Sequence, residues 1–259
     1  MKARVRRILL VLAAAALLLD GGLLLAGRLG AASLPEEDTA YFLDVGEGDC
    51  TLLVSGGSTV LVDAGTPEGA PALVRELKSL GVRRLDAVIA THPHADHIGG
   101  MEAVLRRRRL TPLVPYDGET LTLKDGASLT FLGPAEDIPA DRINDRSLIT
   151  LFQTGSASVL LMGDAEEPAE QSLLRHHPGL RCDILKVGHH GSDTSSSPAF
   201  LSALGAQTAI ISCGTDNDYG HPAEQTLTNL TLAGVRDIRM TAESGTVALP
   251  LIAYKENAV

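Results

Sequence analysis

The residues best suited to chemistry lie in one short stretch that follows an apolar segment at residues 85–90. Three of the eight histidines and one aspartate fall within six residues there, as His92, His94, Asp96 and His97. Imidazole and carboxylate ligands together suit zinc, manganese or iron. Two such ions about 3.5–4 Å apart can hold a water and a scissile phosphate or acyl group between them. The stretch therefore predicts a hydrolytic metal centre.

Further candidates follow other predicted strands, where rigid strand ends can direct side chains to one point. They are Asp63, Asp164, the adjacent pair His189 and His190, and His221. We expect Asp63 to orient a ligand histidine from behind and Asp164 to be the carboxylate that two metals share. His221 lies between a predicted strand and a predicted helix, where it could contact the substrate.

The elements that must position these residues alternate along the chain. Apolar β-rich runs predict strands, and segments with helical periodicity that end at glycine predict helices. The predicted strands are residues 41–45, 51–54, 59–62, 85–90, 129–132, 147–153, 158–162, 182–187, 208–212, 237–240 and 246–249, and the predicted helices are 67–80, 98–109, 166–177, 198–204 and 223–233. One α/β domain over residues 39–259 is the simplest partition.

The N-terminal residues 1–33 predict a signal peptide or a membrane anchor. Four basic residues among the first seven precede a run of about a dozen apolar residues, an order typical of secretory signals. Residues 8–27 are also long enough to span a bilayer, although Asp20 interrupts them. The sequence does not decide between cleavage of this segment and its retention as an anchor. In both cases residues 34–38 form a linker and residues 39–259 face away from the cytoplasm.

Composition excludes several classes of function. The 259 residues carry a net charge of −10, and without residues 1–33 the chain has 17 basic against 31 acidic residues. A basic surface for nonspecific binding of nucleic acid is therefore excluded. With no tryptophan and 3% aromatics, a broad base-stacking surface is also not expected. Three scattered cysteines do not form a disulfide framework, although a single pairing stays open.

The motifs together resemble a known family. His-x-His-x-Asp-His is typical of the metallo-β-lactamase fold, and the flanking motifs resemble the extracytoplasmic hydrolase domain of ComEC competence proteins. The matching stretches, in family order, are 42–49, 62–65, 91–100, 144–148, 162–164, 186–192 and 219–222. They span essentially all of residues 40–250. The resemblance implies a four-layer αββα sandwich with a metal site at the edge where the two sheets meet.

The resemblance also implies roles for individual residues. It assigns His92 and His94 to a first metal, Asp96, His97 and His190 to a second, and Asp164 to a bridge between them. The sequence leaves His189 and His190 open as the terminal ligand, and the Gly-Ser that follows His190 favours that residue.

Four further positions are assigned around the metals. Asp44 and Asp49 of the opening motif resemble residues that reach under the site. Many members of the wider fold supply another histidine to the first metal, whereas here Asn144 and Ser147 occupy that region. The first metal would therefore have fewer protein ligands, which either leaves positions for water or substrate or makes its binding weak.

These assignments predict an extracytoplasmic hydrolase that uses two divalent ions, zinc or manganese, to cleave a phosphodiester. The resemblance implies single-stranded DNA as the substrate, and no nucleotide cofactor is expected. Asp96 or Asp49 would accept a proton, while His189, His221 or Ser192 would hydrogen-bond the phosphoryl oxygens. Residues 8–27 would provide any association with a membrane.

Three alternatives remain beside the nuclease. The first is a phosphodiesterase of envelope polymers, for example a phosphocholine-type esterase. The second is a metal-supported binding module without catalysis, against which the intact ligand set argues. Hydrolysis of β-lactams ranks lower, because the motifs that flank the cluster resemble a different branch of the fold.

Overall fold

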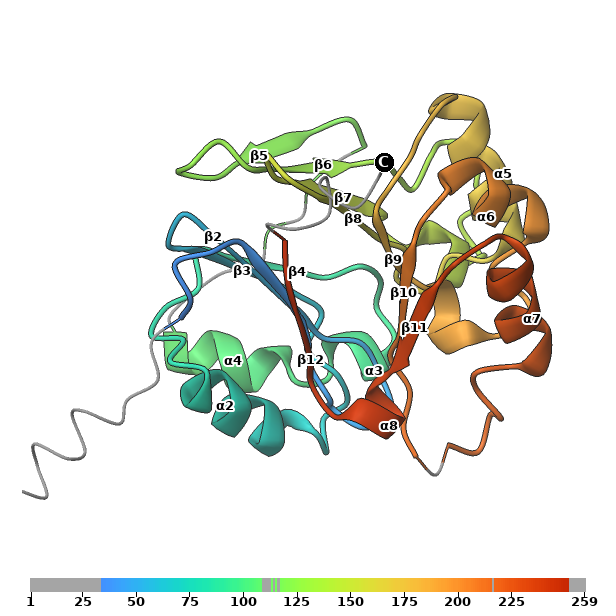
Figure 1. The fold of residues 1–259 in the computed structure, drawn as a ribbon. Coiled ribbons are helices and arrows are strands. Elements are labelled where there is room, and N and C mark those ends of the chain that lie inside the picture. The colour runs from blue at the N-terminus through green and yellow to red at the C-terminus, as the bar shows by residue number, and fades with distance from the viewer. Residues whose placement is uncertain (1–33, 109–112, 114, 116, 216, 252–259) are drawn as a thin grey trace, which may run out of the picture.

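The structure is a computed structural model that describes residues 34–108, 113, 115, 117–215 and 217–251 (Figure 1). The predicted N-terminal helix and signal lie outside these residues. Within the described part of the chain, no helix combines the length and apolar character that crossing a membrane requires.

The first sheet contains five strands among the described residues. Its order is β12 (Val247–Pro250), β1 (Thr39–Phe42), β2 (Thr51–Ser55), β3 (Ser58–Val62) and β4 (Ala87–Ile89). The strands pair antiparallel except that β4 runs parallel to β3. Gly56 and Gly57 connect β2 to β3 with φ values of 53° and 71°, which glycine adopts without strain.

The second sheet contains seven strands among the described residues. Its order is β11 (Asp237–Met240), β10 (Thr208–Ile211), β9 (Ile184–Lys186), β8 (Ser158–Leu161), β7 (Thr150–Gln153), β6 (Ser128–Phe131) and β5 (Thr120–Thr122). Strands β5 to β8 pair antiparallel, and β8 to β11 run parallel. The parallel half brings the carboxyl ends of β8, β9 and β10 to one edge.

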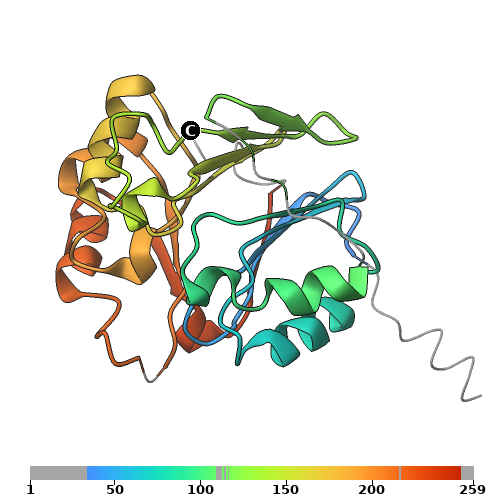
Figure 2. The ribbon, with the colours of Figure 1, turned by 180° about the vertical axis from the view of Figure 1, so that it is seen from behind.

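Helices cover the outer faces of both sheets (Figures 1 and 2). On the first sheet lie α2 (Ala70–Ser79) and α4 (Met101–Arg108), and on the second lie α5 (Glu167–His176), α6 (Pro198–Leu204) and α7 (Glu224–Leu232). One buried apolar cluster lies between the sheets, and two others lie beneath the two groups of helices. The predicted α/β sandwich of two sheets is therefore confirmed.

Short helices lie within the loops at the edge of the sheets. They are α3 (Ala95–Ile98), α8 (Thr241–Ser244) and the 3₁₀ turns η1 (Asn144–Arg146) and η2 (Gly188–Gly191). The sequence predicts one helix over residues 98–109, but the structure begins α4 only at Met101. The Gly100 amide donates to the Gly65 carbonyl, and the Asp96 carbonyl accepts from the Asp49 amide. These contacts replace the i→i−4 hydrogen bond that would join α3 to α4.

Two other differences have simple physical causes. The sequence does not predict β5, because its three residues are exposed or half-buried and Leu121 alone among them is apolar. The disulfide that the sequence left open is absent, since Cys50, Cys182 and Cys213 are all buried free thiols.

Candidate metal centre

The predicted site residues meet where the loops after β4, β8 and β9 converge between the two sheets, close to α3 in Figure 1. His92 and His94 follow β4, Asp164 follows β8, and His190 lies in η2 after β9. Residues separated by almost 100 positions in sequence thus share one pocket.

The first group of potential ligands contains His92, His94 and Asp164, whose ligand atoms lie within 4.8 Å of one another. His92 Nε2 is 3.0 Å from His94 Nδ1 and 3.4 Å from Asp164 Oδ2. Two imidazoles and a carboxylate that converge in this way could hold one cation.

The second group contains Asp96, His97, Asp164 and His190. Asp164 Oδ1 is 3.0 Å from His97 Nε2 and 3.4 Å from His190 Nε2, while Asp96 Oδ2 is 3.2 Å from His190 Nε2. Asp164 directs one oxygen to each group, which is the geometry of a bridging carboxylate. The two groups have the composition that the resemblance implies, and their occupation by cations stays a prediction.

The donor atoms of the second group fit a cation for a further reason. His97 Nε2, His190 Nε2 and Asp164 Oδ1 are buried and have no aligned hydrogen-bond partner among the described residues. Leaving a buried polar atom unsatisfied costs about 1–3 kcal/mol. A divalent cation would satisfy all three atoms together, and the nitrogen and oxygen donors suit zinc or manganese.

Two carboxylates of the site are held in their ionised form. Burial raises the pKa of Asp96, but the adjacent His190 and His97 bring that pKa down to about 2. Burial likewise opposes ionisation of Asp164, and the adjacent His92, His97 and His190 lower its pKa well below the ordinary value. Both carboxylates are therefore anionic at neutral pH. So low a pKa favours Asp96 as a ligand over Asp96 as a proton acceptor.

Asp63 holds His97 from behind. Its Oδ2 accepts hydrogen bonds from His97 Nδ1 at 2.8 Å and from Thr91 Oγ1 at 2.7 Å, and its Oδ1 accepts one from the Thr91 amide at 2.8 Å. This contact places the proton of His97 on Nδ1 and leaves Nε2 facing Asp164. Asp63 thus occupies the orienting position that the sequence predicts.

The Asp63→Asn variant should bind divalent metal about 10- to 100-fold more weakly. Asparagine tolerates the left-handed φ of 60° at this position but cannot accept from both His97 and Thr91 as a carboxylate does. Competition with a chromogenic chelator measures the affinity. Unchanged affinity in a folded variant would contradict the orienting role.

The backbone of η2 separates the roles of the two adjacent histidines. His189 and His190 have φ values of 47° and 53°, between Gly188 and Gly191. His190 faces inward, and its Nδ1 donates to the Ser212 carbonyl at 3.0 Å, so its Nε2 faces the metal groups. The structure therefore brings His190 into the second group, the choice that its neighbouring Gly-Ser favoured.

His189 instead lies at the rim of the site. Its Nδ1 is 3.1 Å from Glu166 Oε1, and its Nε2 is 4.0 Å from Asp164 Oδ2 and 3.4 Å from Asn144 Nδ2. His221 lies beside it, with the two ring centroids 5.6 Å apart. Both histidines are placed where they could contact a substrate.

Ser147 supports the bridging carboxylate from within the site. Its buried Oγ accepts a hydrogen bond from the Asp164 amide at 3.0 Å and lies 3.3 Å from His92 Nδ1. Ser192 is also buried, and its Oγ pairs with Thr194 Oγ1 at 2.9 Å. Ser192 therefore stabilises the loop that contains it and does not line the open cleft.

Asp44 does not reach under the site, in contrast to the expectation from the opening motif. It is exposed, and its Oδ1 accepts from the amide of Gly46 at 3.1 Å, so it stabilises a turn. Asp44 precedes the turn formed by Gly46 and Gly48 and is exposed, whereas Asp49 follows that turn and is buried.

Asp49 is buried beneath His190 and forms an ion pair that the sequence did not reveal. Its Oδ2 is 2.8 Å from the Nζ of Lys186, and its Oδ1 is 3.5 Å from His190 Nδ1. Lys186 is itself only 1% exposed and donates to the Val187 carbonyl at 2.9 Å. In the sequence, the signal for Lys186 was its position as a lone lysine at the end of the apolar strand β9. Its engagement with Lys186 favours Asp49 as a positioning residue over a proton acceptor.

A buried glutamate holds the segment that follows the histidine pair. Glu170 of α5 accepts from the amides of Ser196 and Ser197, which precede α6. Burial raises the pKa of Glu170 from 4.5 to about 7 against the lowering effect of these hydrogen bonds.

This raised pKa predicts a pH-dependent stability. The folded protein binds the proton of Glu170 more tightly than the unfolded chain, so about 3 kcal/mol of stability present below pH 4.5 is lost as the pH rises through about 7. The Glu170→Gln variant should lack this loss. Urea denaturation of both proteins between pH 4 and 8 measures it, and parallel pH profiles would contradict it.

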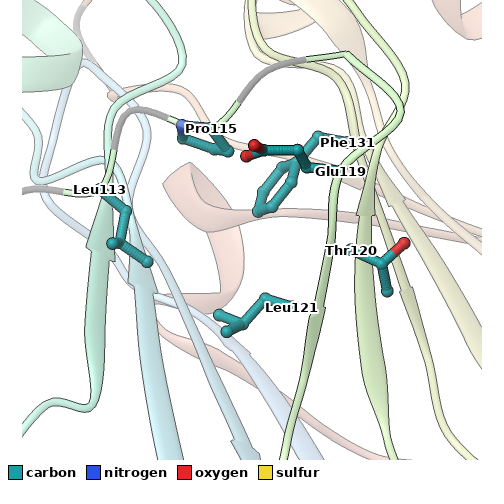
Figure 3. Close-up of a pocket in the computed structure, with 6 residues that line it drawn as sticks. All are labelled: Leu113, Pro115, Glu119, Thr120, Leu121 and Phe131. Atoms are coloured by element: carbon teal, nitrogen blue, oxygen red, sulfur yellow. The ribbon is translucent and has the colours of Figure 1, made fainter.

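Several hollows lie near these elements, and one of them is lined by residues of both ligand groups. A cleft of about 460 Å³ is lined by Glu47, Thr66, Pro67, Glu68, His94, Ala95, Asp96, His190, Tyr219 and His221. Figure 3 shows another, of about 360 Å³, in which Leu113 faces Leu121 and Phe131 beside Pro115 and Glu119. Its described lining residues include one carboxylate and no histidine. The candidate metal ligands therefore open into the first cleft.

Comparisons with known proteins agree with this geometry. The family model of the metallo-beta-lactamase superfamily matches residues 43–151. ComE operon protein 3 of Bacillus subtilis is 31% identical over 83% of this chain and 33% of its own length, and competence protein ComA of Neisseria gonorrhoeae is 34% identical over 90% of this chain and 37% of its own. The chain thus spans about a third of the length of these relatives.

A solved structure supports the fold. The metallo-beta-lactamase fold protein YhfI of Bacillus subtilis superposes with a TM-score of 0.57 over 82% of this chain and all of its own, at 14% identity. Together with the two-sheet fold and the two ligand groups, these matches show that the chain belongs to the metallo-β-lactamase superfamily and is homologous to part of the ComEC-type competence proteins.

Proposed function

We propose that the protein is a metal-dependent phosphodiesterase that acts as a nuclease on single-stranded DNA outside the cytoplasm. The observation that carries the proposal is Asp164, which directs one carboxylate oxygen to each of two adjoining ligand groups at the floor of a cleft. Two divalent cations held there would lower the pKa of a water and neutralise charge on a phosphodiester.

The residues of the chain would hold and orient this site. Ser147 fixes the backbone of Asp164, and Asp63 fixes the tautomer of His97. Burial and the neighbouring His190 and His189 lower the pKa of His221, so it is neutral at pH 7. A neutral imidazole at the cleft wall can donate one hydrogen bond to a phosphoryl oxygen as charge develops there.

The substrate class is supported by the relatives and by charge. The matched relatives carry names of competence and recombination proteins. The protein itself is acidic, so a phosphodiester would be attracted by cations bound at the site and not by the general surface. The basic and apolar leader at residues 1–33 supports an extracytoplasmic location.

The test is a hydrolysis screen of the purified protein with manganese or zinc. Its substrates are single-stranded DNA, double-stranded DNA, bis-(p-nitrophenyl) phosphate, p-nitrophenyl phosphorylcholine and nitrocefin. We expect metal-dependent cleavage of single-stranded DNA and of bis-(p-nitrophenyl) phosphate that a chelator abolishes. Activity on the choline ester alone would favour an envelope phosphodiesterase. Fewer than one metal equivalent with no hydrolysis would favour a binding module.

A further inference from the structure

An exposed aromatic side chain stands at the rim of the cleft. Tyr219 is 77% exposed, and it is one of few large apolar side chains exposed among the described residues. Its ring lies parallel to that of His221, with an interplanar angle of 19° and centroids 5.7 Å apart. His221 in turn lies parallel to His190, at 6.2 Å and 19°. The three rings form a series that leads from solvent to the metal groups.

Hydrogen bonds of one side chain hold the loop that carries Tyr219. The Oδ1 of Asn217 accepts from the His221 amide at 2.7 Å, and its Nδ2 donates to the carbonyls of His221 at 2.7 Å and Gly214 at 3.0 Å. The Gly214 amide donates to Glu47 Oε1 at 3.1 Å, which ties the loop to the first sheet. The tyrosine therefore projects from a backbone that is fixed on both sides.

The loop also contacts the turn that carries His190. The Ala223 amide donates to the Gly191 carbonyl at 2.9 Å, and a Cβ on Gly191 would come within 2.7 Å of Pro222. This close packing sets the distance between the tyrosine ring and the inward-facing His190. Tyr219 and His190 line the same cleft.

The charges of the cleft provide little electrostatic attraction for the parts of a polyanion that lie beyond the metal groups. Glu47 and Glu68 line the same cleft as Tyr219, and the chain as a whole is acidic. A nucleotide next to the scissile phosphodiester must therefore be held by its base. Every base has a π-face that can stack on an aromatic ring, whatever its sequence. In a duplex that face is already stacked within the helix, so this contact selects unpaired strands.

We propose that Tyr219, supported by His221, is the specificity-determining residue of the site and stacks with the base beside the cleaved phosphodiester of a single-stranded nucleic acid. This inference rests on the proposed nuclease function and adds to it the side chain that selects single strands. One aromatic side chain at the site is compatible with the low aromatic content, which excludes only a broad stacking surface.

The experiment compares Tyr219→Ala and Tyr219→Phe with the wild-type protein. The substrates are a single-stranded oligonucleotide and an oligonucleotide of equal length with tetrahydrofuran abasic sites throughout. For the base-bearing strand, Tyr219→Ala should raise KM about 5- to 100-fold with kcat nearly unchanged. Tyr219→Phe should stay within about twofold, since the ring is retained. The abasic strand should be cleaved equally by all three proteins.

Leu232→Ala is the matched control, because Leu232 is 81% exposed on α7 and lies outside the residues that line the cleft. It should leave both substrates unaffected. Equal KM values of Tyr219→Ala and the wild type on the base-bearing strand would overturn the inference while the nuclease function stands. A wild-type protein that cleaves neither strand would overturn both. Loss of choline-ester hydrolysis alone in Tyr219→Ala would overturn it in favour of a quaternary ammonium group on the ring.

Discussion

The Asp164→Ala variant is expected to lose bound metal and to hydrolyse phosphodiesters about 1,000-fold more slowly than the wild-type protein. Asp164 is the residue that the two ligand groups share, so its removal takes one donor from each. The histidines that remain would then hold their cations with fewer negative charges beside them. Elemental analysis of the purified protein and initial rates on bis-(p-nitrophenyl) phosphate measure both effects.

Two further variants test whether the loss is specific to the carboxylate of Asp164. Asp164→Asn preserves the shape of the side chain and should show the same loss, because the carboxylate charge is absent. Asp237→Ala removes a carboxylate that pairs with Arg239 on the edge strand β11, and it should retain metal and activity. If folded Asp164→Ala keeps both metal and wild-type rates, the dinuclear reading of the site is wrong.

The Lys186→Met variant is expected to lower the free energy of unfolding by about 3–5 kcal/mol. Lys186 is 1% exposed, and its ammonium is 2.8 Å from the Asp49 carboxylate, so its removal leaves a buried anion without its lysine partner. The isosteric apolar side chain of methionine separates this loss of charge from the creation of a cavity. Urea denaturation in the presence of a chelator measures the effect without any contribution from bound metal.

A double variant distinguishes the ion pair from packing. Lys186→Met combined with Asp49→Asn removes both charges and should recover a large part of the lost stability, because no unpaired charge remains. Lys124→Met replaces an exposed lysine and should change stability by less than about 0.5 kcal/mol. A Lys186→Met protein as stable as the wild type would show that the pair does not support the fold.

Much of the architecture could be predicted from local pattern. Predicted strands such as 158–162 and 237–240 coincide with β8 and β11 to within a residue, and the predicted helix 198–204 coincides with α6. Their apolar periodicity and flanking glycine or proline are local properties of the chain. Where that signal was weak, as in the exposed strand β5, the prediction failed.

The sequence by itself determined which residues could form the site. The spacing of His92, His94, Asp96 and His97 after an apolar strand marks a metal-binding loop, because both the ligand types and the rigid strand end are written in adjacent residues. The motifs around Asp164 and His190 identified the remaining candidate ligands. They did not show that these residues lie beside the first four in space.

Only the tertiary structure decided the position and contacts of each of these residues. It turns His190 inward and His189 to the rim through two left-handed backbone positions, it leaves Asp44 in a solvent-exposed turn, and it pairs Asp49 with Lys186 across the two sheets. Each of these facts depends on which strand ends are neighbours in space. Sheet order is set by burial and pairing over the whole chain, so no local stretch of sequence contains it.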